Sequence, residues 1–181
     1  LSTLSDGTYS FLEISDGSNT DYLYYDGTVD FENYSLSNLN DIMSADSKDN
    51  VISGNEGNDT FVGTSFTGDT IDGGDETNGD RGSDTVDYSQ VSSAGVNITL
   101  NDDQITTVNI GAATHTIVNI ENVIGTNQVD IITGDNESNI LNGLDGNDSI
   151  SGASGTDTLY GGAGEDELFG GLDNDIIYGD D

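Results

Sequence analysis

Polar and aliphatic positions recur with a fixed nine-residue period in the last third of the chain. From Gly125 onward each unit starts with glycine, carries Asp or Asn at position six and has an aliphatic residue at position eight. Six units follow without a slip, and a seventh begins at Gly179. The sixth positions are Asp130, Asn139, Asp148, Asp157, Asp166 and Asp175, and the eighth are Ile132, Leu141, Ile150, Leu159, Leu168 and Ile177. Such a period indicates a repeat architecture.

Each unit predicts a glycine-rich turn of six residues and a strand of three. Glycine can adopt positive φ angles that strain other residues, so it suits the turn. In the strand the middle side chain points to one face and its neighbours to the other, so position eight faces inward. We expect successive strands to lie in opposite sheets, so that two units make one coil. Turns two units apart then stack about 4.8 Å apart.

A less regular block precedes this one, over residues 36–87. Residues 54–62 form a good unit, and two looser units come before it. Longer turns lead to Asp69 and Asp84, which keep an aliphatic residue two positions later. We expect both blocks to stack into one solenoid.

Residues 1–35 lack the period and carry seven of the thirteen aromatic residues. Asp-Gly pairs at 6–7, 16–17 and 26–27 predict turns between short strands such as 22–24. We interpret the segment as an aromatic-rich β cap over the open end of the roll, which solenoids require. The alternative is an aromatic platform that stacks against sugars.

Residues 88–115 also interrupt the period. Residues 96–100 alternate as a strand, residues 101–103 indicate a turn, and residues 107–110 and 115–117 predict further strands. We interpret them as enlarged coils, which gives one roll over residues 36–181 with repeat blocks at 36–87 and 116–181.

The charge changes this picture, because 35 acidic residues face only two basic ones, Lys48 and Arg81, for a net charge of −33. Nothing here can neutralise phosphates, which excludes nucleic acid as a partner. Leu, Ile, Val and Phe make up 43 of the 181 residues. Low hydrophobicity with a large charge of one sign favours an unfolded chain, so a bound cation is required to hold a small core.

Calcium is the cation that the ligand chemistry favours. Without cysteine, thiolate sites and disulfides are impossible. The oxygens of Asp, Asn and backbone carbonyls prefer hard Ca²⁺ to Zn²⁺ or Cu²⁺. The acidic residues could instead form a solvated surface, but composition alone does not produce Asp at every ninth position behind glycine.

The period resembles the repeats-in-toxin family, whose consensus is GGxGxDxUx with U a large aliphatic residue. Residues 161–169, GGAGEDELF, match every defined position, and the resemblance covers residues 36–87 and 116–181. It implies an all-β fold, a right-handed parallel β-roll with calcium bound between stacked turns. It also implies export by type I secretion machinery and folding on meeting extracellular calcium.

We expect the best calcium sites where turn 143–148 stacks on 161–166 and turn 152–157 on 170–175. Turn 161–166 also pairs with 179–181 in an incomplete site. Turn 125–130 has Thr126 and Gln128 in place of glycine, and turn 134–139 is predicted to bind weakly or stay empty. The predicted metal residues, which supply carboxylates or turn backbone, are Gly54, Glu56, Gly57, Asp59, Asp69, Asp84, Asp130, Asn139, Gly143, Asp145, Gly146, Asp148, Gly152, Ser154, Gly155, Asp157, Gly161, Ala163, Gly164, Asp166, Gly170, Leu172 and Asp175.

These observations favour a secreted, extracellular structural or adhesive segment, attached to the cell surface, and not an enzyme. His115 is the single histidine, and no activated nucleophile or second base accompanies it. No apolar run approaches the ~20 residues of a membrane span. Alternatives are the accessory calcium-folding module of a hydrolase or toxin, a carbohydrate-binding module with a glycan ligand, and a surface-layer segment. Leu1 is not Met and Gly179 begins a further unit, so we expect a piece of a longer protein.

Overall fold

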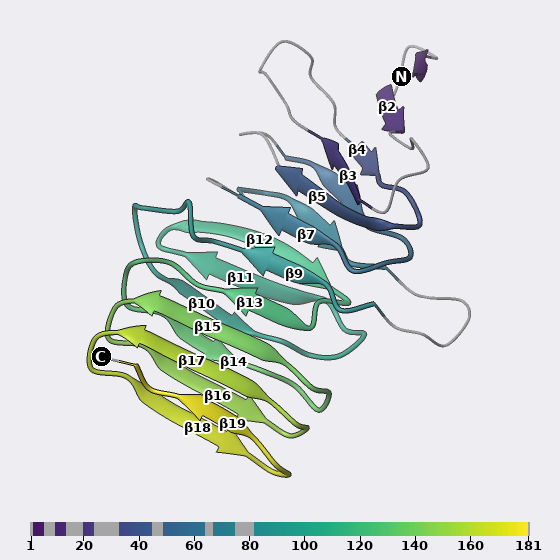
Figure 1. Cartoon of the computed structure of the whole chain (residues 1–181). Helices are drawn as coiled ribbons and strands as arrows, with labels where there is room; N and C mark the ends of the chain where they lie inside the picture. Colours follow the sequence, from purple (N-terminus) through teal and green to yellow (C-terminus); the bar gives the residue numbers. More distant parts are fainter. Residues whose placement is uncertain are drawn as a thin grey trace.

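The computed structural model describes residues 2–5, 10–13, 20–23, 33–44, 49–63, 67–74 and 82–180, with side chains from Tyr34 onward. These residues form strands β1 to β19 and no helix. Strands β1 (Ser2–Ser5) and β2 (Ser10–Glu13) pair antiparallel. The other strands belong to two long sheets that lie face to face along the molecule (Figure 1).

Consecutive strands alternate between the two sheets over both repeat blocks, which confirms the predicted parallel β-roll. The eight-stranded sheet contains β3 (Thr20–Leu23), β5 (Asn40–Ser44), β7 (Thr60–Val62), β9 (Thr85–Asp87), β13 (Asn122–Ile124), β15 (Ile140–Asp145), β17 (Thr158–Ala163) and β19 (Ile176–Tyr178). The nine-stranded sheet contains β4 (Asn33–Ser35), β6 (Val51–Ser53), β8 (Thr70–Asp72), β12 (Ala113–Val118), β11 (Thr106–Ile110), β10 (Val96–Thr99), β14 (Ile131–Thr133), β16 (Ser149–Ala153) and β18 (Glu167–Gly171).

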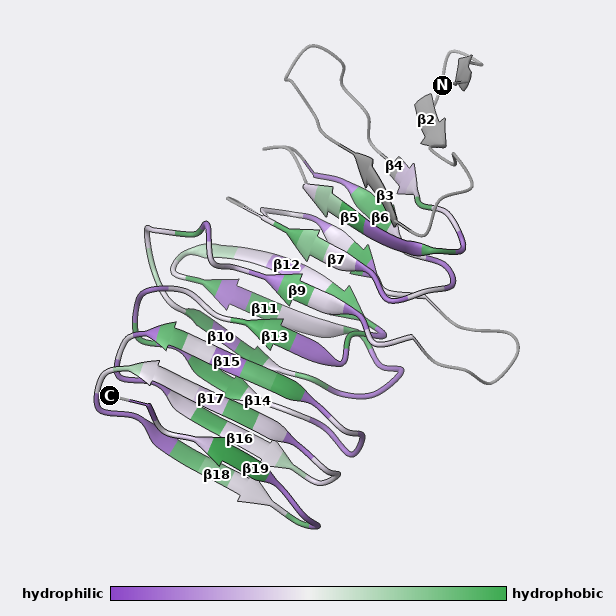
Figure 2. Cartoon of the chain, viewed as in Figure 1, coloured by the Kyte–Doolittle hydropathy of each residue, from purple (hydrophilic) through white to green (hydrophobic). Residues whose placement is uncertain are grey.

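The strand register follows the eighth positions of the repeat. Ile132 pairs with Ile150, and Leu141 pairs with Leu159, one coil later in each sheet. All four side chains are fully buried, as the alternation predicts. Burying an aliphatic side chain of this size stabilises a fold by roughly 1.5–3 kcal/mol. Hydrophobic residues accordingly lie along the strands and hydrophilic residues along the turns (Figure 2).

The middle of the chain departs from simple coils. The strands predicted in residues 88–115 are present as β10, β11 and β12. They run back and forth within the nine-stranded sheet instead of crossing between sheets, because β11 pairs antiparallel with both β10 and β12. Strand β10 continues parallel to β14, and β12 parallel to β8. In the other sheet β9 pairs directly with β13. The two repeat blocks therefore share both sheets.

The sheets extend into the segment that we interpreted as a cap. Strand β3 pairs parallel with β5, and β4 pairs parallel with β6. Tyr34 is buried in the core. The predicted Asp-Gly turns, with most of the other aromatic residues, lie outside the described residues, so the domain boundary at residue 35 stays a prediction. Within the described part of the chain no helix is long and apolar enough to cross a membrane.

The added strands of the middle segment widen the core around His115. Its side chain is 2% exposed, and its Nε2 lies 2.8 Å from the hydroxyl oxygen of Tyr88. Burial lowers the pKa of His115 to about 4 and raises the pKa of Tyr88 well above its ordinary value. Both groups are therefore neutral in the fold near neutral pH.

This burial makes the stability of the calcium-loaded chain depend on pH. The unfolded chain protonates His115 below pH about 6.5 while the fold does not, so stability is present above that pH and is lost as the pH falls toward 4. We expect a loss of about 2 kcal/mol between pH 7 and pH 5 from this residue. Denaturant unfolding of the wild type and His115→Gln at both pH values measures it. Equal pH slopes for the two proteins would contradict the assignment.

Candidate metal sites

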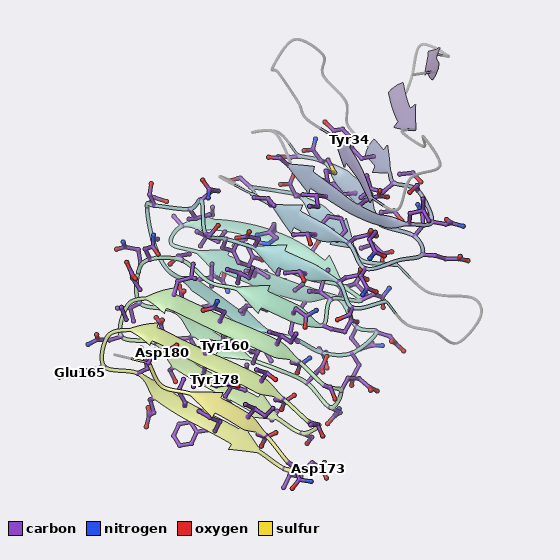
Figure 3. The ribbon with its side chains drawn as sticks, viewed as in Figure 1. Tyr34, Tyr160, Glu165, Asp173, Tyr178 and Asp180 are labelled. Carbon is purple, nitrogen blue, oxygen red and sulfur yellow. The ribbon has the colours of Figure 1, made fainter. Side chains whose placement is uncertain are left out.

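The sixth-position side chains form hydrogen-bonded ladders along both edges of the roll. The backbone N–H of Asp130 donates to Asp148 Oδ1 over 2.8 Å, and the N–H of Asp148 donates to Asp166 Oδ1 over 2.9 Å. Consecutive turns lie at opposite edges, so Glu165 and Asp180 appear at one side of the roll and Asp173 at the other (Figure 3). The stacking that the period predicts, between turns 18 residues apart, is present in these bonds.

The opposite edge repeats the same bonding. The N–H of Asn139 donates to Asp157 Oδ1 over 2.8 Å, and the N–H of Asp157 donates to Asp175 Oδ1 over 3.1 Å. Upstream, the N–H groups of Asp41 and Asp59 donate to Oδ1 of Asp59 and Asp84. One oxygen of each acceptor carboxylate is thus held by the preceding coil.

The second oxygen of the carboxylate faces into its own turn. In Asp148, Asp157 and Asp166 this Oδ2 is buried and accepts no hydrogen bond. Asp148 and Asp157 are 2% and 0% exposed. A buried anionic oxygen without a donor is costly unless a cation meets it, and these atoms are therefore the strongest sign of a metal ligand.

The first glycine of each of these turns leaves a space beside that oxygen. A Cβ on Gly143 would meet Asp148 Oδ2 and would lie 2.7 Å from the carbonyl oxygen of Gly161. A Cβ on Gly152 would meet Asp157 Oδ2 and lie 2.5 Å from the carbonyl oxygen of Gly170. A carboxylate oxygen and a carbonyl from the next coil thus converge on one space. Oxygen donors of this kind suit calcium, and the residues present therefore fit the predicted ion.

Positive φ angles at positions two and four shape these turns. Leu144 and Ala153 have φ of 75° and 74°, and Gly146 and Gly155 have φ of 151° and 110°. Side chains at positive φ cost roughly 1–2 kcal/mol per residue. This conformation directs the N–H of Leu144 to Asn142 Oδ1, 3.1 Å away, and leaves Asp148 Oδ2 without a donor.

The stacked carboxylates raise one another's proton affinity. Burial raises the pKa of Asp148 to about 6, with added repulsion from Asp130 and Asp166. Burial first, and then nearby carboxylates, also raises the pKa of Asp157. A divalent cation beside these oxygens would favour the ionised form of both groups and oppose this rise in pKa.

The structure places the remaining predicted residues less uniformly. A Cβ on Gly54 would meet both Asp59 Oδ2 and the carbonyl of Gly73, as in the downstream turns. The carbonyl of Ala163 accepts the N–H of Gly146, which leaves one of its lone pairs for a metal. Among the described residues no three His, Cys, Asp or Glu side chains gather, because each predicted site takes most of its ligands from the backbone. The ligand set as a whole stays a prediction.

Two predicted positions have other partners. Asp130 Oδ2 accepts the N–H of Thr126 over 2.6 Å, and Asn139 Oδ1 accepts the N–H of Asp135 over 2.9 Å. Asp69 instead makes the ladder bond, because its Oδ1 accepts the N–H of Asn50 over 2.8 Å. The sequence interpretation missed Glu121, whose Oε2 accepts the N–H of Asp84 over 2.8 Å. Its position nine residues before Asp130 could have revealed it.

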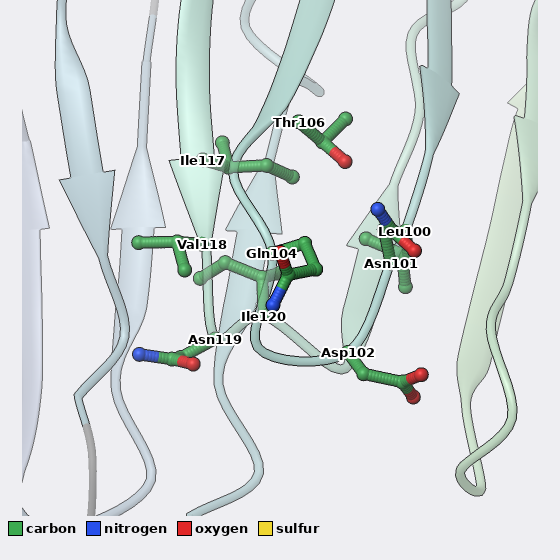
Figure 4. Close-up of a pocket in the computed structure, with 9 residues that line it drawn as sticks. All are labelled: Leu100, Asn101, Asp102, Gln104, Thr106, Ile117, Val118, Asn119 and Ile120. Atoms are coloured by element: carbon green, nitrogen blue, oxygen red, sulfur yellow. The ribbon is translucent and has the colours of Figure 1, made fainter.

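A recess beside the middle hairpin is the pocket shown in Figure 4. It is lined by Leu100, Asn101, Asp102, Gln104, Thr106, Ile117, Val118, Asn119 and Ile120. The lining side chains are aliphatic or uncharged apart from Asp102. The N–H of Asp102 donates to Asp135 Oδ2 in turn 134–139 over 3.0 Å.

One protein-family model matches the chain, and it describes the RTX calcium-binding nonapeptide repeat in four copies. The matches cover residues 37–67, 124–159 and 151–181. They include the turns in which the buried carboxylate oxygens lie, and they leave out the antiparallel middle segment. A comparison with curated proteins found no match.

A methyl group added at Gly152 would fill the space beside Asp157 and should therefore weaken calcium binding. Gly152→Ala places a Cβ against Asp157 Oδ2 and the carbonyl of Gly170. We expect it to weaken calcium binding and to lower the free energy of unfolding in calcium by about 1–3 kcal/mol, the usual cost of overpacking. Gly179→Ala is the matched control, since nothing lies within 4 Å of its added Cβ. Thermal melts of both variants across a range of calcium concentrations measure the effect. Coinciding melting curves for Gly152→Ala and Gly179→Ala would refute the calcium site beside Asp157.

Proposed function

Since the chain carries RTX calcium-binding nonapeptide repeats, we propose that it is a calcium-folded structural or adhesive segment of a bacterial protein exported by type I secretion. RTX repeats bind calcium ions, and proteins that carry them are typically secreted. The segment would act outside the cell or attached to its surface. The predicted calcium ligands are part of this proposal.

The observation that carries the proposal is the buried, unbonded Oδ2 of Asp148 and Asp157. Each of these oxygens lies beside a glycine space that a carbonyl from the next coil also borders. Such an arrangement is unfavourable as a solvated acidic surface, because water cannot reach the oxygen. It is favourable as half of a metal site shared by two stacked turns.

The carboxylate and the first-position glycine have different roles in such a site. The Oδ1 hydrogen bond orients each carboxylate, and the first-position glycine keeps the space open. Bound calcium would supply two positive charges to carboxylates from neighbouring coils. Because each carboxylate is held by the coil before it, ordering of one turn prepares the next, and we expect cooperative binding.

This dependence couples folding to export. With 35 acidic residues against two basic ones, the chain repels itself when no cation is bound, which keeps it extended for passage through an exporter. Extracellular calcium modules have dissociation constants of roughly 0.1–1 mM, so the chain would fold after export. His115 lies in the core against Tyr88, which supports a structural rather than a catalytic role for the single histidine.

A calcium titration tests the proposal directly. In EGTA we expect an expanded chain with little β signal, and across a titration to roughly 10 mM Ca²⁺ we expect a cooperative change to a compact β spectrum. Circular dichroism and size-exclusion chromatography measure it, with Mg²⁺ as the control ion. An unchanged folded spectrum in EGTA would contradict the proposal.

Removing one negative charge tests the ligand assignment. Asp157→Asn keeps an oxygen that can accept the N–H of Asn139 but loses the carboxylate. We expect the calcium midpoint to rise roughly tenfold, since ligand charge sets calcium affinity. Asp103→Asn is the matched control, because it removes the same charge from an exposed position. Isothermal titration calorimetry with calcium measures the midpoint of both variants, and equal midpoints would refute the assignment of Asp157 as a calcium ligand.

A further inference from the structure

Three turns of the roll share a set of hydrogen bonds that turns 143–148, 152–157 and 161–166 lack. In turns 36–41, 125–130 and 134–139 the N–H of position two donates to the side-chain oxygen of position six. Ser37 donates to Asp41 Oδ2 over 2.8 Å, and Thr126 donates to Asp130 Oδ2 over 2.6 Å. Asp135 donates to Asn139 Oδ1 over 2.9 Å. We call these the closed turns, and we call turns 143–148, 152–157 and 161–166 the open turns.

A second bond completes each closed turn. The N–H of position four donates to the side-chain oxygen of position two, from Leu39 to Ser37, from Gln128 to Thr126 and from Glu137 to Asp135, over 3.0–3.2 Å. The hydroxyl groups of Ser37 and Thr126 also donate to the carboxylate at position six over 2.9 Å. The side chain at position two therefore links the turn backbone to its sixth residue.

The backbone conformation separates the two classes. Positions two and four have positive φ in every open turn, whereas positions two and four of the closed turns do not. Opening turn 125–130 would require positive φ at the β-branched Thr126, where the strain is largest. In addition, Asn139 carries no charge, so turn 134–139 lacks an anionic ligand at position six.

The position of the closed turns in the roll is also regular. The sixth-position N–H of each one donates to Oδ1 of the Asp 18 residues later, from Asp41 to Asp59, from Asp130 to Asp148 and from Asn139 to Asp157, each over 2.8 Å. In all three cases the accepting Asp has its Oδ2 beside a first-position glycine and a carbonyl of the next coil. A closed turn therefore precedes each of the calcium-fitting turns 54–59, 143–148 and 152–157.

We infer that the closed turns replace the calcium ion with their own hydrogen bonds and orient the first calcium-binding carboxylate of each run. Asp130 and Asn139, which the repeat pattern assigned to the metal, then act as positioning residues. The inference rests on the proposed calcium binding, and it specifies which turns take the ion. In an open turn Oδ2 of the sixth residue has no hydrogen-bond donor and can bind a cation. In a closed turn the side-chain oxygen of the sixth residue already accepts the N–H of position two.

Counting bound ions in variants of the full chain tests this assignment. Thr126→Gly with Gln128→Gly restores glycine at positions two and four, and we expect it to bind one calcium ion more than the wild type. Ala153→Thr with Gly155→Gln transfers the closed pattern to turn 152–157, and we expect it to bind one ion fewer. Thr126→Ser is the matched control, because Ser37 makes the same bonds, and it should leave the number unchanged. Native mass spectrometry across a calcium titration gives each count.

Terbium provides a second readout that does not depend on the variants folding. Anomalous diffraction from wild-type crystals grown with Tb³⁺ should show ions beside Asp148 and Asp157 and none beside Asp130 or Asn139. An ion beside Asp130 or Asn139, or an unchanged count in the double-glycine variant, would overturn the inference. A wild type that binds no calcium under any condition would instead overturn the proposed function.

Discussion

The hydrogen bond from a sixth-position N–H to a carboxylate 18 residues later underlies the rest of the structure. It joins neighbouring coils of the regular repeats at both edges of the roll, and it determines which oxygen of the carboxylate remains for other partners. Because Oδ1 of Asp148 is taken by Asp130, Oδ2 is forced into the glycine turn, where water does not reach it. The proposed metal site would therefore be a consequence of how the coils stack, and a single repeat could not form it.

The same bond also brings carboxylates close enough to repel one another, and a bound cation would offset this repulsion. Stacking at an 18-residue interval places Asp130, Asp148 and Asp166 in one column, and their repulsion adds to burial in raising the pKa of Asp148 to about 6. Lys48 and Arg81 are the only basic residues of the chain, and both lie outside the repeat block that begins at Gly125. An external cation is then the available source of positive charge for this column.

The nine-residue period was sufficient to predict the strands, the sheets and the inward residues of the repeat blocks, except Ile177 in the last strand, which is 47% exposed. Positions such as Ile132 and Leu141 are fully buried because period, strand length and hydrophobicity agree there. The same reasoning could not separate a crossing coil from a hairpin in residues 88–115. Alternation in Val96, Ile98 and Leu100 predicts a strand equally well in either case, and only the pairing of β11 with β10 and β12 decides.

The turns show a similar limit. Missing glycine at Thr126 and Gln128 marked turn 125–130 as unusual, but sequence could not show that the Thr126 N–H meets Asp130. That bond accompanies a backbone in which Thr126 lacks the positive φ of Leu144 and Ala153 at the equivalent positions.

The distribution of charge explains why closed turns lie where they do. Residues 88–142 contain six acidic residues, and the shorter stretch 143–181 contains ten. The first stretch also holds the widened core of Tyr88, Val108 and His115, so apolar contacts can stabilise its coils. Turns 125–130 and 134–139 are the last two turns before the acidic stretch, and each is satisfied by hydrogen bonds alone. They thus join coils that burial stabilises to coils in which the Oδ2 atoms of Asp148, Asp157 and Asp166 are buried without a hydrogen-bond donor.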